Sequence, residues 1–404
     1  MLLFLGSGVS LPSHLPSVMQ ITERLLKDTY YCGINSTGTY YSAKHEDLRS
    51  VEPMLKVQQL LQLLSEIDEY YLQSIAPYWS GQKFLKTGSI YRSTTSYEDL
   101  FYLTEQIKMT GVGLLDDASI GAFVDLVERK AGNILEGEDR DTRLISLYHL
   151  AVEASRLIEW MVAMSLDTEC TIGLDLVAEL AESQWIERLD IVTLNHDTLV
   201  ERVLTNNNIS FADGFGSQDG DVRWQDDTEY DTKDARVRLI KPHGSVNWYK
   251  FSVNGKERYA MIQGKDPTQC RNQKGERLQN LITTPSFLSG TNKVISYNRG
   301  IYTDVFYRFH KAFRENDLMV MSGYGWGDTA INFRLENWVD YNKNNRIILL
   351  HENPKELMSR SFQLDQSYNG LVKVGQLVPV PQWLCNTSLS DLTKKMQPNS
   401  FIIG

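Results

Sequence analysis

The sequence predicts an α/β fold, built as a doubly wound parallel sheet with a large helical insertion. On both flanks of the chain, short runs of aliphatic residues alternate with stretches of helical periodicity, which is typical of a parallel sheet covered by helices. Between the flanks, apolar residues recur every three or four positions, which indicates helices alone. We therefore expect a discontinuous sheet domain, residues 1–50 and 186–404, and a helical subdomain, residues 51–185.

Size and charge narrow the class of protein. The chain has 404 residues, of which 42% are hydrophobic and 23% charged, so it is long enough for a large globular domain with an insertion. The net charge of −10 argues against a surface that neutralises phosphates. We expect no direct binding of nucleic acid, and any contact with it through a partner.

No segment predicts export, membrane insertion or a metal site. Residues 1–5 are apolar but lead directly into a glycine, and no later stretch reaches the roughly 18 apolar residues of a spanning helix, so we expect a cytoplasmic protein that does not contact a membrane. The four cysteines, Cys32, Cys170, Cys270 and Cys385, form no Cys-x-x-Cys pair. We expect no zinc ribbon, no other metal and no disulfide framework.

The first strand, turn and helix predict a phosphate-binding arrangement. Residues 2–5 form a buried strand and residues 17–27 an amphipathic helix. The turn between them consists of Gly6, Ser7, Gly8, Val9 and Ser10. Glycines let the backbone approach an anion while free N–H groups point at it. A tight turn that binds no ligand explains such a short motif equally well.

The central segment predicts helices with apolar stripes, such as Leu60, Leu64 and Ile67. We expect these stripes to form core, and the acidic residues 136–141 to form a solvated loop between helices. Residues 189–194 then restart the strand pattern, with a helix expected over residues 198–204.

Polar side chains follow the strand at residues 189–194. Thr193 belongs to it, and Asn195, His196 and Asp197 come directly after it. Asn195 or Asp197 is able to cap the next helix, which is the structural alternative to a ligand-binding role. We expect His196 to be a packing histidine that points away from the site.

The next strand, residues 237–240, ends at Lys241 and Pro242, and His243, Gly244 and Ser245 follow. Because proline donates no ladder hydrogen bond, the strand stops there and presents His243 at its end. Around this strand we expect a long polar loop over residues 212–231, a hairpin that pairs residues 246–249 with residues 258–262, and a mobile linker over residues 264–277.

The last predicted units are a helix over residues 300–316, an apolar strand over residues 318–321 and another strand over residues 346–351. The strand at residues 318–321 leads into a second glycine turn, made of Ser322, Gly323, Tyr324 and Gly325, and Asp328 is expected to cap the helix that follows. Asn353 and Pro354 follow the final predicted strand. Since the carboxyl ends of parallel strands meet at one edge, these polar ends predict a nucleotide site in a Rossmann-like fold.

At these motifs the chain resembles the sirtuin superfamily, and within it the silent-information-regulator-like NAD hydrolases of bacterial anti-phage defence. Members carry Gly-Ala-Gly-x-Ser, Thr-x-Asn-x-Asp and His-Gly motifs, a Gly-Tyr-Ser-Phe-x-Asp-x-x-Ile-Asn segment and a late Asn-Pro. In the same order this chain has residues 6–10, residues 193–197, His243–Gly244, residues 323–332 and Asn353–Pro354. It lacks the four-cysteine zinc module of the deacylases, and its helical insertion replaces their acyl-lysine cleft.

The resemblance implies roles for individual residues. His243 would act as general base or charge-stabilising acceptor near a ribose hydroxyl, Asn195 would position water or the ribose face, and Asp197 would hold the nicotinamide carboxamide. The pyrophosphate would lie on Gly6, Ser7, Gly8 and Ser10. Other residues of these motifs would surround the nucleotide: Val9, Thr193, Gly244, Ser245, Ser322, Gly323, Tyr324, Gly325 and Asn353. Trp248, Tyr249 and Tyr297 would line the entrance or pack in the core.

The resemblance implies an NAD hydrolase that depletes NAD in abortive infection, with NAD as its substrate. Because the chain ends soon after the last predicted strand, we expect activation by self-assembly into a homo-oligomer or by a partner protein of the same system. A DNA-translocase-type ATPase and a short Argonaute both remain open as partners. A zinc-independent NAD-dependent protein deacylase and a non-catalytic NAD-sensing module are the alternative functions.

Overall fold

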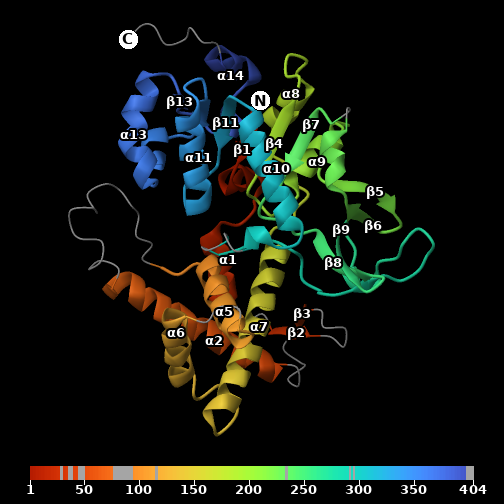
Figure 1. The fold of residues 1–404 in the computed structure, drawn as a ribbon, viewed down its shortest axis with the longest axis vertical. Helices are drawn as coiled ribbons and strands as arrows, with labels where there is room; N and C mark the ends of the chain where they lie inside the picture. Colours follow the sequence, from red (N-terminus) through yellow and green to blue (C-terminus); the bar gives the residue numbers. More distant parts are fainter. Residues whose placement is uncertain are drawn as a thin grey trace.

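The computed structural model describes residues 1–27, 31–34, 40–43, 51–75, 94–113, 117–232, 235–290, 293 and 296–396. At its centre lies a six-stranded sheet of order β13-β12-β11-β1-β4-β7, whose neighbouring strands all run parallel (Figure 1). The strands are β1 (Leu2–Leu5), β4 (Leu189–Thr193), β7 (Val237–Ile240), β11 (Leu318–Ser322), β12 (Arg346–Leu350) and β13 (Leu377–Val380). The predicted α/β class is confirmed.

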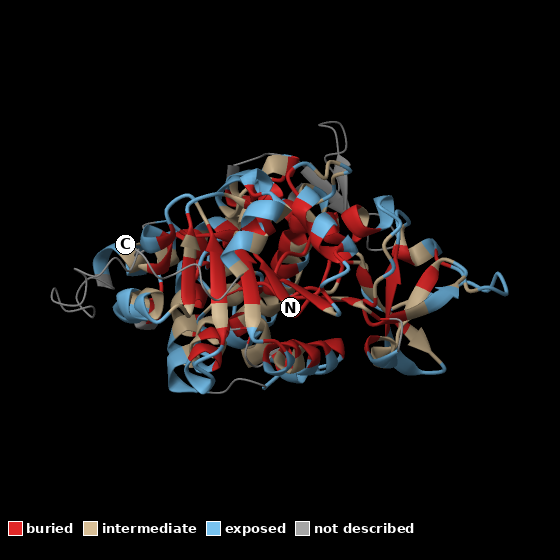
Figure 2. Cartoon of the chain, turned by 90° about the horizontal axis from the view of Figure 1, so that it is seen from above, coloured by how far each residue is buried: buried red, intermediate tan, exposed pale blue. Residues whose placement is uncertain are grey.

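Helices cover both faces of this sheet, because alternate side chains of a strand point to opposite faces. Leu2 and Phe4 pack toward α10 to α13, whereas Leu3 and Leu5 pack toward α8, α9 and α14. The helices are α8 (Asp175–Glu182), α9 (Leu199–Asn206), α10 (Ile301–Glu315), α11 (Thr329–Tyr341), α12 (Pro354–Met358), α13 (Phe362–Lys373) and α14 (Leu389–Met396). Figure 2 shows the buried strands between the two helical layers.

A separate helical unit lies beside the carboxyl edge of the sheet (Figure 1). It consists of α1 (Val18–Lys27), α2 (Val51–Tyr70), the π-helical turn η3 (Tyr71–Ile75), α5 (Tyr97–Gly111), α6 (Ala118–Lys130) and α7 (Arg140–Ser165), with the small hairpin β2 (Tyr31–Ile34) and β3 (Tyr40–Ala43) nearby. Its core includes Ile21 and Leu25 of α1, while α8 packs on the sheet. The packed helical unit therefore differs at both ends from the predicted range 51–185.

A second, antiparallel sheet of order β10-β8-β9-β6-β5 flanks β7. Its strands are β5 (Phe215–Asp219), β6 (Val222–Gln225), β8 (Trp248–Val253), β9 (Lys256–Ile262) and β10 (Gln279–Asn280). The predicted pairing of β8 with β9 is confirmed. The predicted polar loop over residues 212–231 is wrong, because β5 and β6 form a hairpin there, followed by the 3₁₀ helix η4 (Asp227–Asp231).

The segment predicted as a mobile linker, residues 264–277, is tied to the β5–β6 turn. It contains the 3₁₀ helix η5 (Pro267–Gln269). The backbone N–H of Arg271 donates to Asp221 Oδ2 at 2.8 Å, and that of Gln273 donates to Asp219 Oδ1 at 2.8 Å. The two carboxylates therefore fix the segment against the hairpin, and the expectation of a free linker is wrong.

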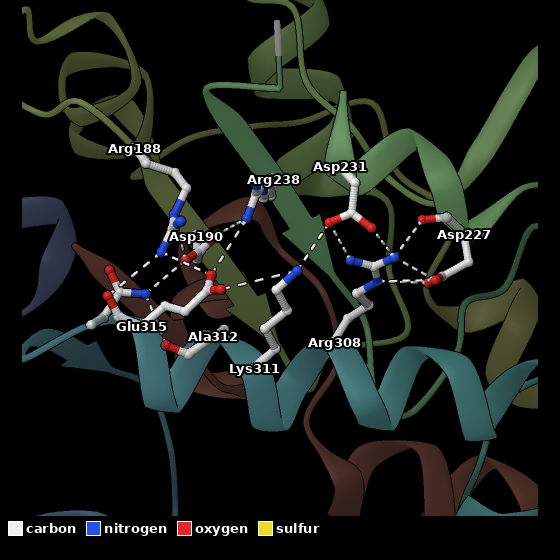
Figure 3. A network of polar contacts seen from close by, with 10 residues as sticks. Arg188, Asp190, Asp227, Asp231, Arg238, Arg308, Lys311, Ala312 and Glu315 are labelled. Atoms are coloured by element: carbon white, nitrogen blue, oxygen red, sulfur yellow. Dashed lines mark hydrogen bonds and ion pairs between the residues drawn. The ribbon is translucent and has the colours of Figure 1, made fainter. Parts of the chain in front are cut away.

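Charged side chains fix α10 against the sheet at its amino edge (Figure 3). Arg308 donates to Asp227 and Asp231 of η4. Asp190, only 1% exposed at the start of β4, accepts a hydrogen bond of 2.6 Å from Asn316 Nδ2. Because this network lies at the amino ends of the strands, it holds the sheet and leaves the carboxyl ends for a site.

Among the described helices, none combines the length and apolar character needed to cross a membrane.

Candidate functional site

A cleft of about 560 Å³ opens at the carboxyl edge of the parallel sheet. Four strand ends contribute to its lining: Gly6, Ser7, Gly8 and Ser10 after β1; Asn195, His196 and Asp197 after β4; His243 after β7; and Tyr324, Gly325, Trp326, Gly327 and Asp328 after β11. Tyr97, Glu98 and Leu166 of the helical unit form part of the opposite wall, and Lys293 and Arg360 complete the charged lining. Residues predicted from separate motifs therefore share one cleft.

The glycines after β1 and β11 allow the two turns to interlock. The N–H of Gly6 donates to Ser322 O at 3.0 Å, and that of Gly8 donates to Gly323 O at 2.9 Å. A Cβ on Gly6 would lie 2.6 Å from Gly323 O, and one on Gly323, whose φ is +70°, would lie 2.6 Å from Val9 N. The packing of the two turns thus requires glycine here even without a ligand.

Asn195 and Asp197 are linked to the first turn by hydrogen bonds. Asn195 Nδ2 donates to Gly6 O at 3.2 Å and to Ser10 Oγ at 2.9 Å, and Ser10 Oγ donates to Asp197 Oδ2 at 2.8 Å. Asp197 Oδ1 also accepts the N–H of Leu199 at 3.1 Å, at the start of α9. Asp197 therefore accepts an N–H of the first turn of α9 while it lines the cleft, although the N-cap residue of that helix is Thr198.

A buried lysine supports the turn that follows β4. Lys241, 2% exposed, donates to Glu201 Oε1 and Ser245 Oγ at 2.8 Å each, and to the carbonyl of Asp197. Ser245 Oγ donates in turn to His196 O at 3.2 Å. Lys241 and Ser245 thus fix the backbone that presents Asn195, His196 and Asp197, and neither belongs to the cleft lining.

His243 lies in a buried cluster of polar groups. Its Nε2 is 2.8 Å from Tyr297 Oη and 3.4 Å from Asp328 Oδ2, and its Nδ1 is 3.5 Å from Lys293 Nζ. Burial and the charge of Lys293 lower the pKa of His243, while Asp328 opposes them. Burial alone would raise the pKa of Asp328, but His243 and Lys293 hold it well below its usual range. His243 is therefore neutral at neutral pH, next to an ionised carboxylate.

His196 also lines the cleft, contrary to the expectation that it points away from the site. Its ring lies 4.6 Å from the ring of Phe287 and 6.3 Å from the ring of His243, measured between centroids. Burial, above all, and the nearby charge of Lys293 hold the pKa of His196 well below its usual value. The imidazole is therefore neutral, and it both packs and faces the site.

Several predicted residues lie outside the cleft lining. Thr193, Gly244, Ser245 and Gly323 support the turns from behind. Val9 and Ser322 instead line an adjoining cavity of about 330 Å³, which shares Gly8 and Leu11 with the cleft and is closed by Trp383, Leu384 and Cys385. Asn353 is exposed at the start of α12 and belongs to neither lining.

Lys293, Glu98 and Arg360 are charged residues of the cleft that no sequence motif indicated. The segment 291–295 contains no strand or helix pattern, so nothing in the sequence connects Lys293 with His243. Asp328 was predicted as the N-cap of α11, and it is, because its side chain accepts the N–H of Ile331 at 3.2 Å. The same Asp328 side chain also lies beside His243, because the turn of residues 323–328 brings it there.

The fold and the cleft define an α/β protein with a polar site at the carboxyl edge of a parallel sheet. Residues 190–369 match the SIR2-like domain family. That range contains the turns after β4, β7, β11 and β12, but not the glycine turn after β1. This similarity fits an NAD-related activity, since SIR2-like domains occur in NAD-dependent enzymes. No curated protein matches this chain. Among the described residues, no group of three or more His, Cys, Asp or Glu side chains is placed to hold a metal ion.

Proposed function

We propose that this chain is an NAD⁺ glycohydrolase, which uses water to cleave the bond between nicotinamide and ribose. The observation that carries the proposal is the meeting of His243 and Asn195 in one cleft with the glycine turn after β1. The two residues arrive from the paired strands β4 and β7. A neutral imidazole and an oriented amide are the parts that such a hydrolysis needs.

In the proposed reaction, a water oxygen bonds to ribose C1′ while the bond from C1′ to the pyridinium nitrogen breaks. The electron pair of that bond neutralises the leaving nicotinamide, and the proton of the water passes to His243. Because burial and Lys293 lower the pKa of His243, its ring is unprotonated at neutral pH. Asp328, 3.4 Å from Nε2, stabilises the imidazolium that forms.

Asn195 is positioned for the second role in this reaction. Its amide nitrogen donates to Gly6 O and Ser10 Oγ, which fixes the orientation of the side chain. The amide oxygen is the group left for the cleft, where it would accept a hydrogen bond from the attacking water or a ribose hydroxyl. The glycine turn thus orients the Asn195 side chain toward the substrate.

The size and charge of the site suit a dinucleotide. The cleft of about 560 Å³ adjoins the cavity of about 330 Å³, whose lining by Val9, Trp383 and Leu384 suits a flat, apolar base. Arg360 at the cleft is available to the two negative charges of a pyrophosphate. We propose that nicotinamide binds beside His243 and the adenosine half beyond Gly8.

The biological setting belongs to the same proposal. The resemblance to NAD hydrolases of anti-phage defence supports a role in depleting NAD during abortive infection. Such an activity has to be silent in an uninfected cell, so we propose activation by assembly into a homo-oligomer or by a partner protein of the same system. The helical unit, which contributes Tyr97, Glu98 and Leu166 to the cleft, is the part through which assembly would reach the site.

The test is to incubate the purified protein with NAD, alone and with the product of the neighbouring gene, and to quantify nicotinamide and ADP-ribose. We expect both products to form in equal amounts. His243→Ala and Asn195→Ala should lower turnover by at least about 100-fold while NAD still binds, in line with the loss of a general base. His149→Ala, an exposed histidine on α7, is the matched control and should keep full activity.

Two results would contradict the proposal. A wild-type protein that never consumes NAD in any assembled state is not a hydrolase. Nicotinamide release that requires an acetylated peptide would identify a deacylase instead.

A further inference from the structure

The cleft contains a carboxylate that the proposed reaction does not use, that of Glu98 in the first turn of α5. Its side chain is 22% exposed, so its oxygens can be reached from the cleft. Lys293 Nζ lies 3.9 Å from Glu98 Oε1, which is too far for a hydrogen bond. The helical unit therefore supplies one negative charge to a site whose other charges come from the sheet domain.

The backbone on both sides of Glu98 is fixed. The N–H of Tyr97 donates to Thr22 Oγ1 of α1 at 2.8 Å. Ser96 and Asp99 form a capping box, in which the N–H of Ser96 donates to Asp99 Oδ2 at 3.0 Å and the N–H of Asp99 donates to Ser96 Oγ at 3.3 Å. Glu98 thus lies between two residues that are held in place, and this rigid turn presents its carboxylate to the cleft.

The other two carboxylates of the cleft lining already accept hydrogen bonds from the protein. Asp197 accepts one from Ser10 and one from the start of α9, and Asp328 accepts one from the start of α11. Within the described part of the chain, no hydrogen bond reaches the carboxylate of Glu98. A half-buried carboxylate loses water contacts, so one that lacks hydrogen-bond donors suits a ligand that brings hydroxyl groups or positive charge.

The charges beside His243 are negative in balance. Lys293 Nζ lies 3.5 Å from His243 Nδ1, 3.7 Å from Asp328 Oδ2 and 3.9 Å from Glu98 Oε1. Two carboxylates therefore surround one ammonium group, while the imidazole itself is neutral. The charge of Glu98 acts on the pKa of His243 in the same direction as that of Asp328, so its field extends to the proposed base. An excess of negative charge at this point complements a substrate that becomes positive there.

We propose that Glu98 is a catalytic residue supplied by the helical unit, whose carboxylate accepts a hydrogen bond from a ribose hydroxyl and stabilises the positive charge that develops on the ribose. This inference rests on the proposed function. As the glycosidic bond breaks, the transition state resembles an oxocarbenium ion, with its charge on C1′ and the ring oxygen. Glu98 forms no covalent bond, so water still bonds to C1′ and its proton still passes to His243. Because α5 has to be in place for this contact, movement of the helical unit would switch the reaction.

Glu98→Gln tests the charge alone, because glutamine keeps the size and a hydrogen-bond acceptor. The matched control is Asp141→Asn, which removes an exposed carboxylate from the first turn of α7 in the same helical unit, outside the cleft lining. We would measure kcat and KM for NAD, each on the pH plateau, in the wild type and in the Lys293→Met background. Calorimetry would give the affinities for ADP-ribose and for an analogue in which a protonated nitrogen replaces the ring oxygen of the terminal ribose.

We expect Glu98→Gln to lower kcat by about 100-fold, the effect of one preorganised electrostatic contact, while KM and the affinity for ADP-ribose change by no more than about twofold. The wild type should bind the cationic analogue at least about tenfold more tightly than ADP-ribose, and Glu98→Gln should lose this advantage. The loss of kcat should persist in the Lys293→Met background, because the carboxylate acts on the substrate and not through the lysine.

The inference is overturned if the loss of kcat disappears in the Lys293→Met background, or if Glu98→Gln binds the cationic analogue as tightly as the wild type does. A wild type that never consumes NAD would end the proposed function alone, since the two affinities still decide whether Glu98 favours a cationic ribose.

Discussion

The charges on either side of His243 nearly cancel, and this balance gives a prediction in which two substitutions act in opposite directions. With an effective dielectric constant of about 20, a protonated His243 gains about 5 kcal/mol from Asp328 at 3.4 Å and loses about 5 kcal/mol to Lys293 at 3.5 Å. Burial then decides the outcome, which is the lowered pKa of His243. Removing either charge should leave the other unopposed.

Asp328→Asn should lower the pKa of His243 further, and Lys293→Met should raise it, because each substitution removes one adjacent charge. Asn is a good N-cap, so the first substitution retains the start of α11, where Asp328 accepts the N–H of Ile331. The base must be unprotonated to work. The acidic limb of the pH profile should therefore move to lower pH in Asp328→Asn and to higher pH in Lys293→Met.

The assay is the pH dependence of NAD turnover, with NMR titration of the imidazole resonances as a measurement that does not require activity. The His243 resonance is assigned by its absence in His243→Gln. At the plateau, Asp328→Asn should also be slower, by about tenfold or more, because a weaker base accepts the proton less readily. Shifts of the same sign in both variants, or no shift in either, would refute the assignment of the two charges.

Three further predictions concern stability. Lys241→Met should lower the unfolding free energy, measured in urea, by about 3–5 kcal/mol, because Glu201 loses its buried partner. Adding Glu201→Gln should recover roughly half of that loss. A double variant as unstable as Lys241→Met alone would contradict this prediction. Gly323→Ala should cost about 2 kcal/mol or more, because its φ is +70° and its Cβ would meet backbone, while Gly325→Ala, with open space around it, should be nearly neutral in the same melt. Burial raises the pKa of Glu159 to about 7, so stability should fall as the pH rises from about 4.5 to about 7, because the unfolded state releases a proton there that the folded state keeps. Glu159→Gln should flatten that part of the stability curve. An unchanged slope in Glu159→Gln would show that another group titrates.

The parts of the fold that the sequence predicted are those whose signal is local. Strands β1, β4, β7, β11 and β12 are runs of aliphatic residues because helices bury them on both faces. The hairpin of β5 and β6 was missed because its residues are mostly polar, and its strand character comes from the pairing of β6 with β9 far along the chain. β13 was missed because it is short and contains Pro379, which is tolerated only because β13 is an edge strand.

The same distinction between local and tertiary signals explains which residues of the site could be predicted. The rule that ligands bind at the carboxyl edge correctly brought Asn195 and His243 together, since their strands pair directly and their ends are fixed by the sheet. The same rule was wrong for Asn353, because the cleft extends over the ends of β11, β1, β4 and β7, and β12 lies beyond β11. Which way a side chain points within a turn is not a property of the strand order.

His196 and Lys293 are two cleft residues that the rule on strand ends does not place. His196 occupies the middle of a motif whose neighbours were assigned roles, and only the folded structure shows that it lines the cleft while its ring packs on Phe287. Lys293 reaches His243 from a segment about fifty residues away that follows no strand. The groups that position a reacting atom come from strand ends, which a sequence reveals. The groups that tune its proton affinity arrive through tertiary contacts, and for this chain they are the ones that the two-charge experiment on Asp328 and Lys293 measures.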